Sequence, residues 1–177
     1  PSCVTSNYVS DPASLQFNSL VVEPTYAVSP PFTEDINNIM VSFSLKSEST
    51  LYSGIIEVGV MSDPNNIATF ESVQIINPSN TDWDNYQIYF NNTTLSGPDN
   101  CIAFRHIPAI DNYYFWLDDV TFDYMPSCPT PSDLYATDVT NNYAQLHWTE
   151  NGSATAWTVK ISFTPIDPAV DPGDLSA

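Results

Sequence analysis

The chain has 177 residues and a formal net charge of −18, because 21 Asp and Glu stand against only 3 Lys and Arg. Nucleic-acid binding needs clustered Lys and Arg, so the composition argues against nucleic acid and against anionic membrane surfaces as partners. Hydrophobic residues make up 42 % of the chain and aromatic residues 13 %, which is too much for a disordered acidic tail. An acidic surface suits cations, above all Ca²⁺, and neutral ligands such as sugars.

Apolar residues alternate with polar ones along most of the chain, and this period of two is typical of half-buried strands. The segments with the pattern are 39–46, 55–61, 70–76, 86–90, 102–105 and 113–124. Polar turn clusters separate several of them, at 62–66, 77–80 and 96–100. Short strands joined by polar turns predict an all-β, antiparallel sandwich. No apolar run approaches the roughly 18 residues that span a bilayer, so we expect no membrane insertion.

The composition changes at residues 126–131, where three Pro fall within six residues. Neither a helix nor a central strand accommodates such a stretch, so it predicts a linker between a first domain at 1–125 and a second at 132–177. Short strands are predicted in the second domain at 134–136, 144–148 and 157–161. A complete sandwich takes ~90–100 residues, so this domain is expected to be incomplete and the chain to be part of a longer multidomain protein.

The second domain resembles the first half of a fibronectin type III module. That family has a Pro-rich lead, a Leu-x-Trp triplet on its second strand and an aromatic residue on its third. Here the lead is 131–134, the triplet is Leu146 to Trp148, and Trp157 supplies the aromatic residue. The resemblance implies a second, incomplete Ig-like β-sandwich, because the later strands of the family have no match.

Five segments of the first domain resemble, in the same order, a jelly-roll module known as cleaved adhesin or MAM-like and recorded in surface proteins as choice-of-anchor J. They are Pro1–Cys3, Ser14–Phe17, Glu57–Pro64, Ile102–His106 and Leu117–Thr121. The resemblance implies a jelly-roll fold and a secreted or cell-surface protein of bacterial adhesin type. Two features depart from the family: its opening strand before the Pro-x-Cys segment has no counterpart, and Val4 stands where a Trp commonly follows the cysteine.

The segment 113–124 carries an acidic pair, Asp118 and Asp119, whose side chains point to opposite faces if the strand is regular. Asp118 then lies in an apolar row that also contains Trp116, Val120, Phe122 and Tyr124. A buried carboxylate needs a partner, and with three basic residues a salt bridge is the least available one. Two interpretations stay open: a Ca²⁺ ion meets the carboxylate, or loop amides donate hydrogen bonds to it.

The family resemblance also implies a structural Ca²⁺ against the Asp-Asp strand. Its further ligands are expected from distant parts of the sequence, with Glu23 and Glu34 as candidates and the loop Asp111–Asn112 as another. A bulge in the strand would exchange the roles of Asp118 and Asp119. Such an ion would hold loops on the edge of the sandwich and take no part in chemistry.

The sequence predicts no enzyme. Two carboxyl groups on opposite faces of a strand cannot flank one glycosidic bond. His147 lies inside a predicted core strand, and His106 has no nucleophile partner that the sequence identifies. The three cysteines, Cys3, Cys101 and Cys128, allow at most one internal disulfide, and their spacing argues against zinc.

Sugar recognition on β-sandwiches uses exposed aromatic rings, with Asn, Asp and Gln side chains that fix the hydroxyl groups. Trp83 in a polar turn is one candidate, although it also fits a structural role as a cap on the core. The other candidates are Asp111, Asn112, Tyr113 and Tyr114. We therefore expect a non-catalytic binding or adhesion module for a glycan or a host or matrix protein. The alternatives are an accessory module of a larger secreted peptidase or glycoside hydrolase, and a spacer without a ligand.

Overall fold

The computed structural model describes residues 1–18, 22–51, 54–91, 93–109 and 113–159. The chain divides into two compact units, Pro1–Pro126 and Ser127–Ala177. The division falls at the start of the Pro-rich segment 126–131. In the described part of the chain, no helix has the length and hydrophobicity needed to cross a membrane.

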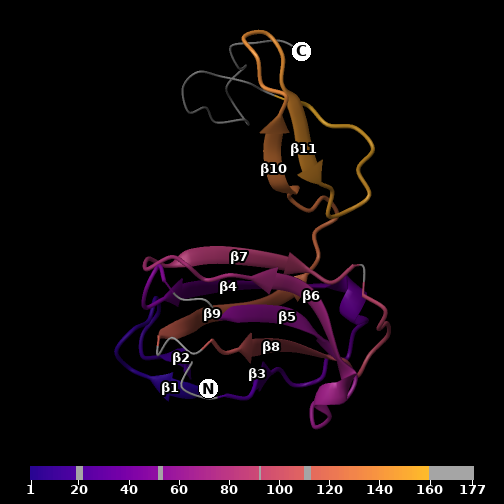
Figure 1. The fold of residues 1–177 in the computed structure, drawn as a ribbon. Helices are drawn as coiled ribbons and strands as arrows, with labels where there is room; N and C mark the ends of the chain where they lie inside the picture. Colours follow the sequence, from indigo (N-terminus) through magenta and orange to yellow (C-terminus); the bar gives the residue numbers. More distant parts are fainter. Residues whose placement is uncertain (19–21, 52–53, 92, 110–112, 160–177) are drawn as a thin grey trace. The chain divides into compact units, whose positions relative to one another are not determined.

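The first unit is a sandwich of two antiparallel sheets (Figure 1). The five-stranded sheet has the order β1 (Ser2–Val4), β2 (Ser14–Asn18), β9 (Tyr114–Tyr124), β4 (Ile39–Ser47), β7 (Asp84–Tyr89). The four-stranded sheet has the order β3 (Thr25–Val28), β8 (Cys101–Ile107), β5 (Ile55–Met61), β6 (Phe70–Ile76). This architecture confirms the predicted all-β, antiparallel jelly-roll sandwich. Strands β1 and β3 are too short to show a clear alternation, and the period of two had not indicated them.

Two short 3₁₀ helices lead into strands of the sandwich, η1 (Ile36–Asn38) before β4 and η2 (Ile67–Thr69) before β6. Each begins at a side chain that accepts a backbone N–H two residues on. Asp35 accepts from Asn37 at 3.0 Å, and Asn66 accepts from Ala68 at 3.1 Å. These bonds satisfy amides that the short helices leave open. Each helix ends at a cap residue, Ile39 or Phe70, that is also the first residue of a strand.

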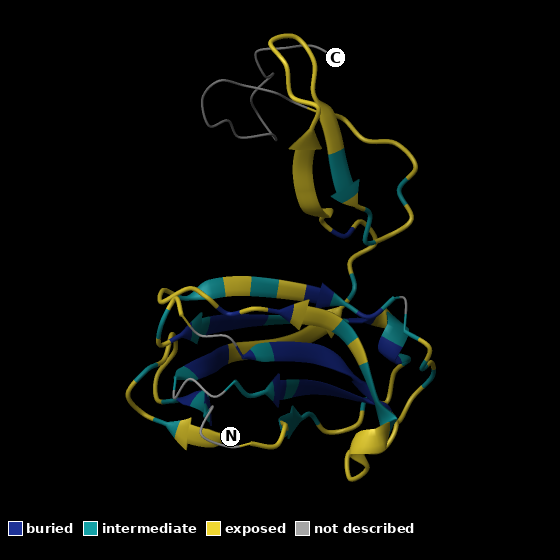
Figure 2. Cartoon of the chain, viewed as in Figure 1, coloured by how far each residue is buried: buried dark blue, intermediate teal, exposed yellow. Residues whose placement is uncertain are grey.

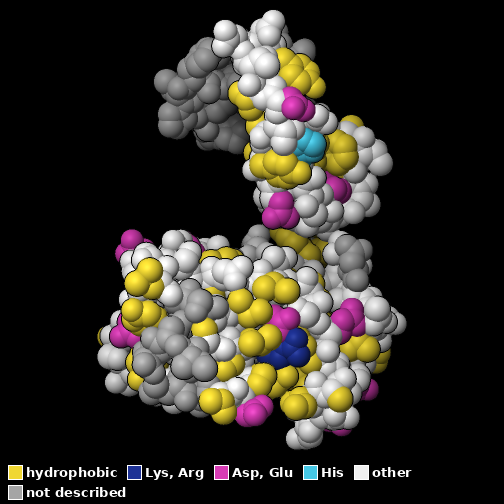
Figure 3. Space-filling view, in the orientation of Figure 1, with side chains coloured by type: hydrophobic (Ala, Val, Ile, Leu, Met, Phe, Trp, Pro, Cys, Tyr) yellow, Lys and Arg dark blue, Asp and Glu magenta, His cyan; other side chains and the backbone are white. Residues whose placement is uncertain are grey.

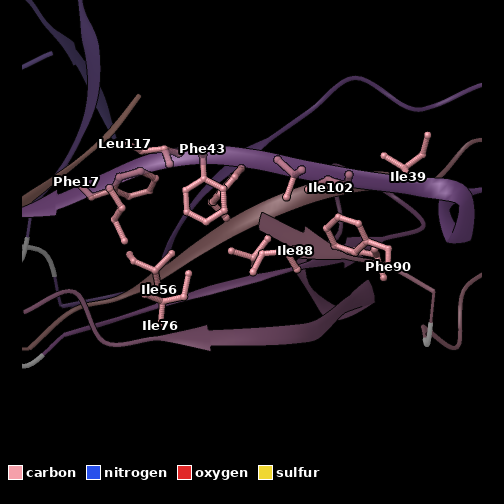
Figure 4. Packing of buried hydrophobic residues seen from close by; sticks show 14 of the residues in the cluster. Phe17, Ile39, Phe43, Ile56, Ile76, Ile88, Phe90, Ile102 and Leu117 are labelled. Carbon is pink, nitrogen blue, oxygen red and sulfur yellow. The ribbon is translucent and has the colours of Figure 1, made fainter. Parts of the chain in front are cut away.

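The hydrophobic core lies between the two sheets of the first unit (Figures 2 and 4). In β4 the alternate residues Ile39, Val41, Phe43 and Leu45 are at most 4 % exposed, as their spacing predicted. The ring of Phe43 meets that of Phe104 from the other sheet edge-on, with centroids 5.1 Å apart. Each such side chain contributes roughly 1.5–3 kcal/mol of hydrophobic stabilisation, so the alternation fixes which face of β4 turns inward.

Strand β9 is irregular, and the apolar row predicted along it is wrong. Asp118 pairs with Ser44 and Thr121 pairs with Ser42, so two residues of β9 lie opposite the single residue Phe43. The bulge is at Asp119, which has a φ of 50°. Asp118, before the bulge, lies opposite the outward residue Ser44 and faces away from the core. Phe122 and Tyr124, after the bulge, lie opposite the inward residues Val41 and Ile39 and turn to the core side.

The described part of the second unit is one antiparallel hairpin of β10 (Ser132–Thr137) and β11 (Gln145–Thr149). Every residue of β10 is exposed. Tyr135 stacks on His147 with centroids 4.7 Å apart, and Trp148 meets Trp157 edge-on at 5.4 Å. Residues 157–159 form no strand, and 160–161 of the predicted third strand lie outside the described residues. The fibronectin type III assignment stays a prediction.

Candidate functional site

The five-stranded sheet has a second face, called here the outer face, which points away from the core. Because alternate residues of β4 turn inward, Ser42, Ser44 and Lys46 turn outward. Pairing across the strands places the outward residues of β7 and β9 beside them. They are Asn85 and Gln87 on β7 and Trp116 and Asp118 on β9.

A groove of about 400 Å³, called here the polar groove, is hollowed into this face. It is lined by Ser42, Phe43, Ser44, Asn85, Tyr86, Gln87 and Asp119. The hydroxyl of Ser44 donates to Oδ1 of Asn85 at 2.9 Å, which fixes the amide at the floor of the groove. Burial, helped by the charge of Asp84, raises the pKa of Tyr86. The groove therefore offers neutral hydroxyl and amide groups with one carboxylate at its margin.

A row of alternating aromatic and basic side chains, called here the tryptophan–lysine row, lies next to the polar groove. The Nζ atom of Lys46 is 5.5 Å from the ring centroid of Trp83 and 5.4 Å from that of Trp116. Tyr114 continues the row, with its ring centroid 6.4 Å from that of Trp116. Cation–π attraction to two indoles holds the ammonium group in place. Sequence reasoning missed Lys46 and Trp116, because their proximity to Trp83 arises only from strand pairing.

The predicted ligand-binding residues are thus partly brought together. Trp83 is half-buried at one end of the tryptophan–lysine row and Tyr114 is half-buried at the other. Tyr113 packs against the core, so it supports the fold rather than this face. Asp111 and Asn112 lie outside the described residues.

Asp118 is 8 % exposed, and backbone amides meet its carboxylate. Oδ2 accepts from the amides of Val9 at 2.6 Å and Ser10 at 3.1 Å, and Oδ1 accepts from the amide of Asp119 at 2.8 Å. Hydrogen bonds of this kind satisfy a buried carboxylate without a counter-ion. The second of the two interpretations drawn from the sequence therefore describes Asp118 in this structure. The bonds also tie the N-terminal segment to β9 across 109 residues of chain.

The residues expected to complete a calcium site do not gather around Asp118. Glu34 instead accepts hydrogen bonds from Thr33 and Tyr124, which lower its pKa, and Glu23 is exposed. Within the described ranges, no three Asp, Glu, His or Cys residues form a group that could hold a metal ion. Two amide hydrogens point at Oδ2 of Asp118 and a third points at Oδ1, and amide hydrogens repel a cation. The described residues thus do not fit Ca²⁺ at this carboxylate, and the ion stays a prediction.

The two histidines lie in packed surroundings. His106 is fully buried between the rings of Phe17 and Phe115, with centroids 5.8 and 5.1 Å away, and its Nδ1 is 3.5 Å from the hydroxyl of Thr25. His147 stacks on Tyr135, and its Nε2 is 2.9 Å from the hydroxyl of Thr137. Neither ring is placed beside the polar groove, so neither is a candidate general base there.

The outward face of the four-stranded sheet carries a different cluster, called here the arginine patch, of Tyr26, Glu57, Phe70 and Arg105. Arg105 forms an ion pair with Glu57, and its guanidinium lies 4.3 Å from the centroid of the Phe70 ring. The hydrogen bond with Glu57 raises the pKa of Arg105. Figure 3 shows a basic side chain bordered by hydrophobic and acidic groups on the visible face of the first unit. The sandwich thus carries the polar groove with its aromatic rings on one face and the arginine patch, an ion pair beside aromatic rings, on the other.

The first unit shares its β-sandwich fold with solved structures of adhesin domains. The K2 cleaved adhesin domain of Lys-gingipain matches with a TM-score of 0.57 and 16 % identity, over 68 % of this chain and 81 % of that domain. The K3 domain of Lys-gingipain from Porphyromonas gingivalis matches with a TM-score of 0.50 and 16 % identity, over 63 % of this chain and 74 % of that domain. At such identity the likeness shows the fold.

A family 30 carbohydrate-binding module also matches, with a TM-score of 0.49 and 16 % identity, over 72 % of this chain and 77 % of that module. No protein-family profile matches the sequence. No curated protein matches it significantly.

Proposed function

We propose that the chain is a non-catalytic binding module, secreted or displayed at the cell surface, that holds a glycan on the outer face of the five-stranded sheet. The observation that carries the proposal is the polar groove beside the tryptophan–lysine row. Sugars present hydroxyl groups that both donate and accept, and the amides of Asn85 and Gln87 and the hydroxyl groups of Ser42 and Ser44 can do the same. A volume of about 400 Å³ is in the range of small-ligand sites.

Aromatic rings supply the second part of glycan recognition. Pyranose rings have an apolar face of C–H groups, which packs well on indole or phenol rings. Trp83 lies two residues before Asn85, and its ring centroid is 5.5 Å from the Nζ atom of Lys46 on the outer face, so it supplies ring surface near the polar groove. The fold supports this arrangement because three strands, β4, β7 and β9, hold the side chains in fixed register.

The membership in the cleaved adhesin, MAM-like or choice-of-anchor J group is part of the same proposal. It is supported by the order of the five sequence motifs and by the fold shared with the K2 domain. An accessory role in a larger secreted protein is compatible with it, since the similar domains are themselves parts of Lys-gingipain. A fibronectin type III spacer in the second unit belongs to this proposal too.

A host or matrix protein is the second candidate partner, and the arginine patch favours it. Tyr and Arg are enriched among the residues that dominate protein–protein affinity. Here Tyr26, Phe70 and Arg105 lie together, with the Tyr26 and Phe70 rings 5.9 Å apart. A protein partner would therefore contact the four-stranded sheet, on the opposite side of the sandwich from the polar groove.

A glycan array followed by titration calorimetry with the full chain tests the first proposal. Gln87→Ala should weaken binding of an array hit about tenfold, because a hydrogen-bonding group is lost from the groove. Gln74→Ala is the matched control, since Gln74 is an exposed glutamine on β6 of the other sheet. Equal affinities of the two variants would contradict a site in the polar groove. An array without any hit would favour the protein partner.

A further inference from the structure

Lys46 is unusual among the charged groups of this chain. It is half-buried on the outer face, and no carboxylate of the described residues lies within ion-pair distance of its Nζ atom, whereas Arg105 is paired with Glu57. The chain holds 21 acidic residues and 3 basic ones, so acidic residues that could pair with a lysine are abundant. Its neighbours on both sides, Trp83 and Trp116, are neutral indole rings, which attract a cation but do not supply a counter-charge.

The acids that lie nearest to Lys46 along the strands are held by other donors. Asp118 accepts the amides of Val9, Ser10 and Asp119, as described above. Asp84 accepts a hydrogen bond from the side chain of Asn80. Glu48, two residues after Lys46, accepts from the amide of Tyr114 at 3.1 Å. Each of these three carboxylates thus has a hydrogen-bond donor other than the ammonium group.

A second donor in the same row also lacks an acceptor. The indole Nε1 of Trp116 is buried and has no hydrogen-bond partner among the described residues. Trp116 is only 6 % exposed, and buried N–H groups are nearly always paired, so this one calls for an acceptor other than the described residues. Lys46 and Trp116 face each other across β4 and β9. Two donors for which the described residues supply no acceptor or counter-ion thus lie beside one another.

We infer that the tryptophan–lysine row binds an anionic group of the ligand, and that the glycan is therefore an acidic one, carrying a carboxylate or a sulfate. This inference rests on the proposed function. Lys46 supplies the charge and Trp83 and Trp116 supply flanking ring surface. The polar groove begins two residues away along β4 and β7, about 7 Å at the rise of a strand. A sugar ring with its acidic group at Lys46 therefore places a neighbouring ring in the groove.

Paired oligosaccharides that differ only in charge test the inference. Calorimetry with the full chain compares oligogalacturonate with its methyl ester, sialyllactose with lactose, and a sulfated galactose oligosaccharide with its unsulfated form. The wild type should bind the acidic member of at least one pair about tenfold more tightly. The pair that shows this preference identifies a carboxylate or a sulfate as the group bound.

Variants at one position separate charge from structure. Lys46→Met keeps the aliphatic stem and should abolish the preference while retaining affinity for the neutral member, and Lys46→Arg should keep the preference. Gln74→Glu on β6 lowers the net charge by the same amount and should change the preference less than about twofold. If Lys46→Met does not fold, salt provides the second measurement: the wild-type preference should shrink as ionic strength rises, and a salt-independent preference would overturn the inference.

The possible failures are distinguishable. Equal affinity for the acidic and neutral members of every pair, or a preference that survives in Lys46→Met, overturns the inference and leaves the proposed glycan site standing. No binding of any oligosaccharide, acidic or neutral, overturns the proposed function itself.

Discussion

Asp118 and Asp119 provide a matched pair of substitutions. Both are replaced by Asn, so each variant loses one negative charge and keeps the shape of the side chain. Asp118 is buried and accepts three backbone amides, whereas Asp119 is exposed at the bulge. Asn tolerates the positive φ of 50° at position 119, so the exposed replacement adds no backbone strain.

The expected loss at Asp118 follows from its hydrogen bonds. An Asn side chain has one acceptor oxygen, so at best it keeps the two bonds to Val9 and Ser10 and turns an N–H₂ group toward the amide of Asp119. Hydrogen bonds to a charged group contribute about 1.5–3 kcal/mol and neutral ones about 0.5–1.5 kcal/mol. Val9 and Ser10 are exposed and water partly replaces their partner, so we expect Asp118→Asn to cost about 2 kcal/mol.

Urea unfolding followed by near-ultraviolet circular dichroism of the core aromatic rings measures the difference. Asp119→Asn should leave the free energy of unfolding within about 0.5 kcal/mol of the wild type. Equal stabilities of the two variants would refute the conclusion that the amides hold Asp118. Thermal unfolding of the wild type in Ca²⁺ and in chelator should give the same midpoint, because the amides already occupy Oδ2. A midpoint several degrees higher in Ca²⁺ would support the calcium interpretation.

Two further outcomes follow from packing in the first unit. Gly59→Ala would place a Cβ atom 2.1 Å from the backbone oxygen of Glu71, so β5 and β6 must separate, and we expect a loss of about 3 kcal/mol in unfolding free energy; wild-type stability would contradict that contact. Thiol labelling of the native protein, analysed by mass spectrometry, should modify the exposed Cys3 and Cys128 and spare Cys101, which is fully buried and whose pKa is raised by burial and by the charge of Asp63. Equal labelling of all three would show that this part of the sandwich opens.

Strand β4 shows what the sequence could predict. Its alternation of Ile39, Val41, Phe43 and Leu45 with polar residues is a local pattern, and a strand with one buried face must obey it. The same reasoning failed along β9, because a bulge moves every later residue to the other side of the sheet. The bulge at Asp119 depends on pairing with β4, and no pattern within β9 reveals it.

The candidate site likewise contains one residue that the sequence indicated and others that only strand pairing brings to it. Trp83 was a candidate from its own polar surroundings, and the structure places it on the outer face. Lys46 and Trp116 come from two other strands, and only the register of β4 with β9 brings them beside it. The partners of Asp118 are backbone amides more than a hundred residues away, and the amino-acid types of Val9 and Ser10 give no sign of that role.

Nuclear magnetic resonance tests the binding face most directly, because each of the 4 tryptophans gives one indole N–H signal. Titration of the labelled chain with an oligosaccharide that binds on the array should move the indole signals of Trp83 and Trp116 and the side-chain amides of Asn85 and Gln87. The indoles of Trp148 and Trp157 in the second unit should stay in place. Shifts confined to the second unit or to the residues around Arg105 would contradict a glycan site on the five-stranded sheet.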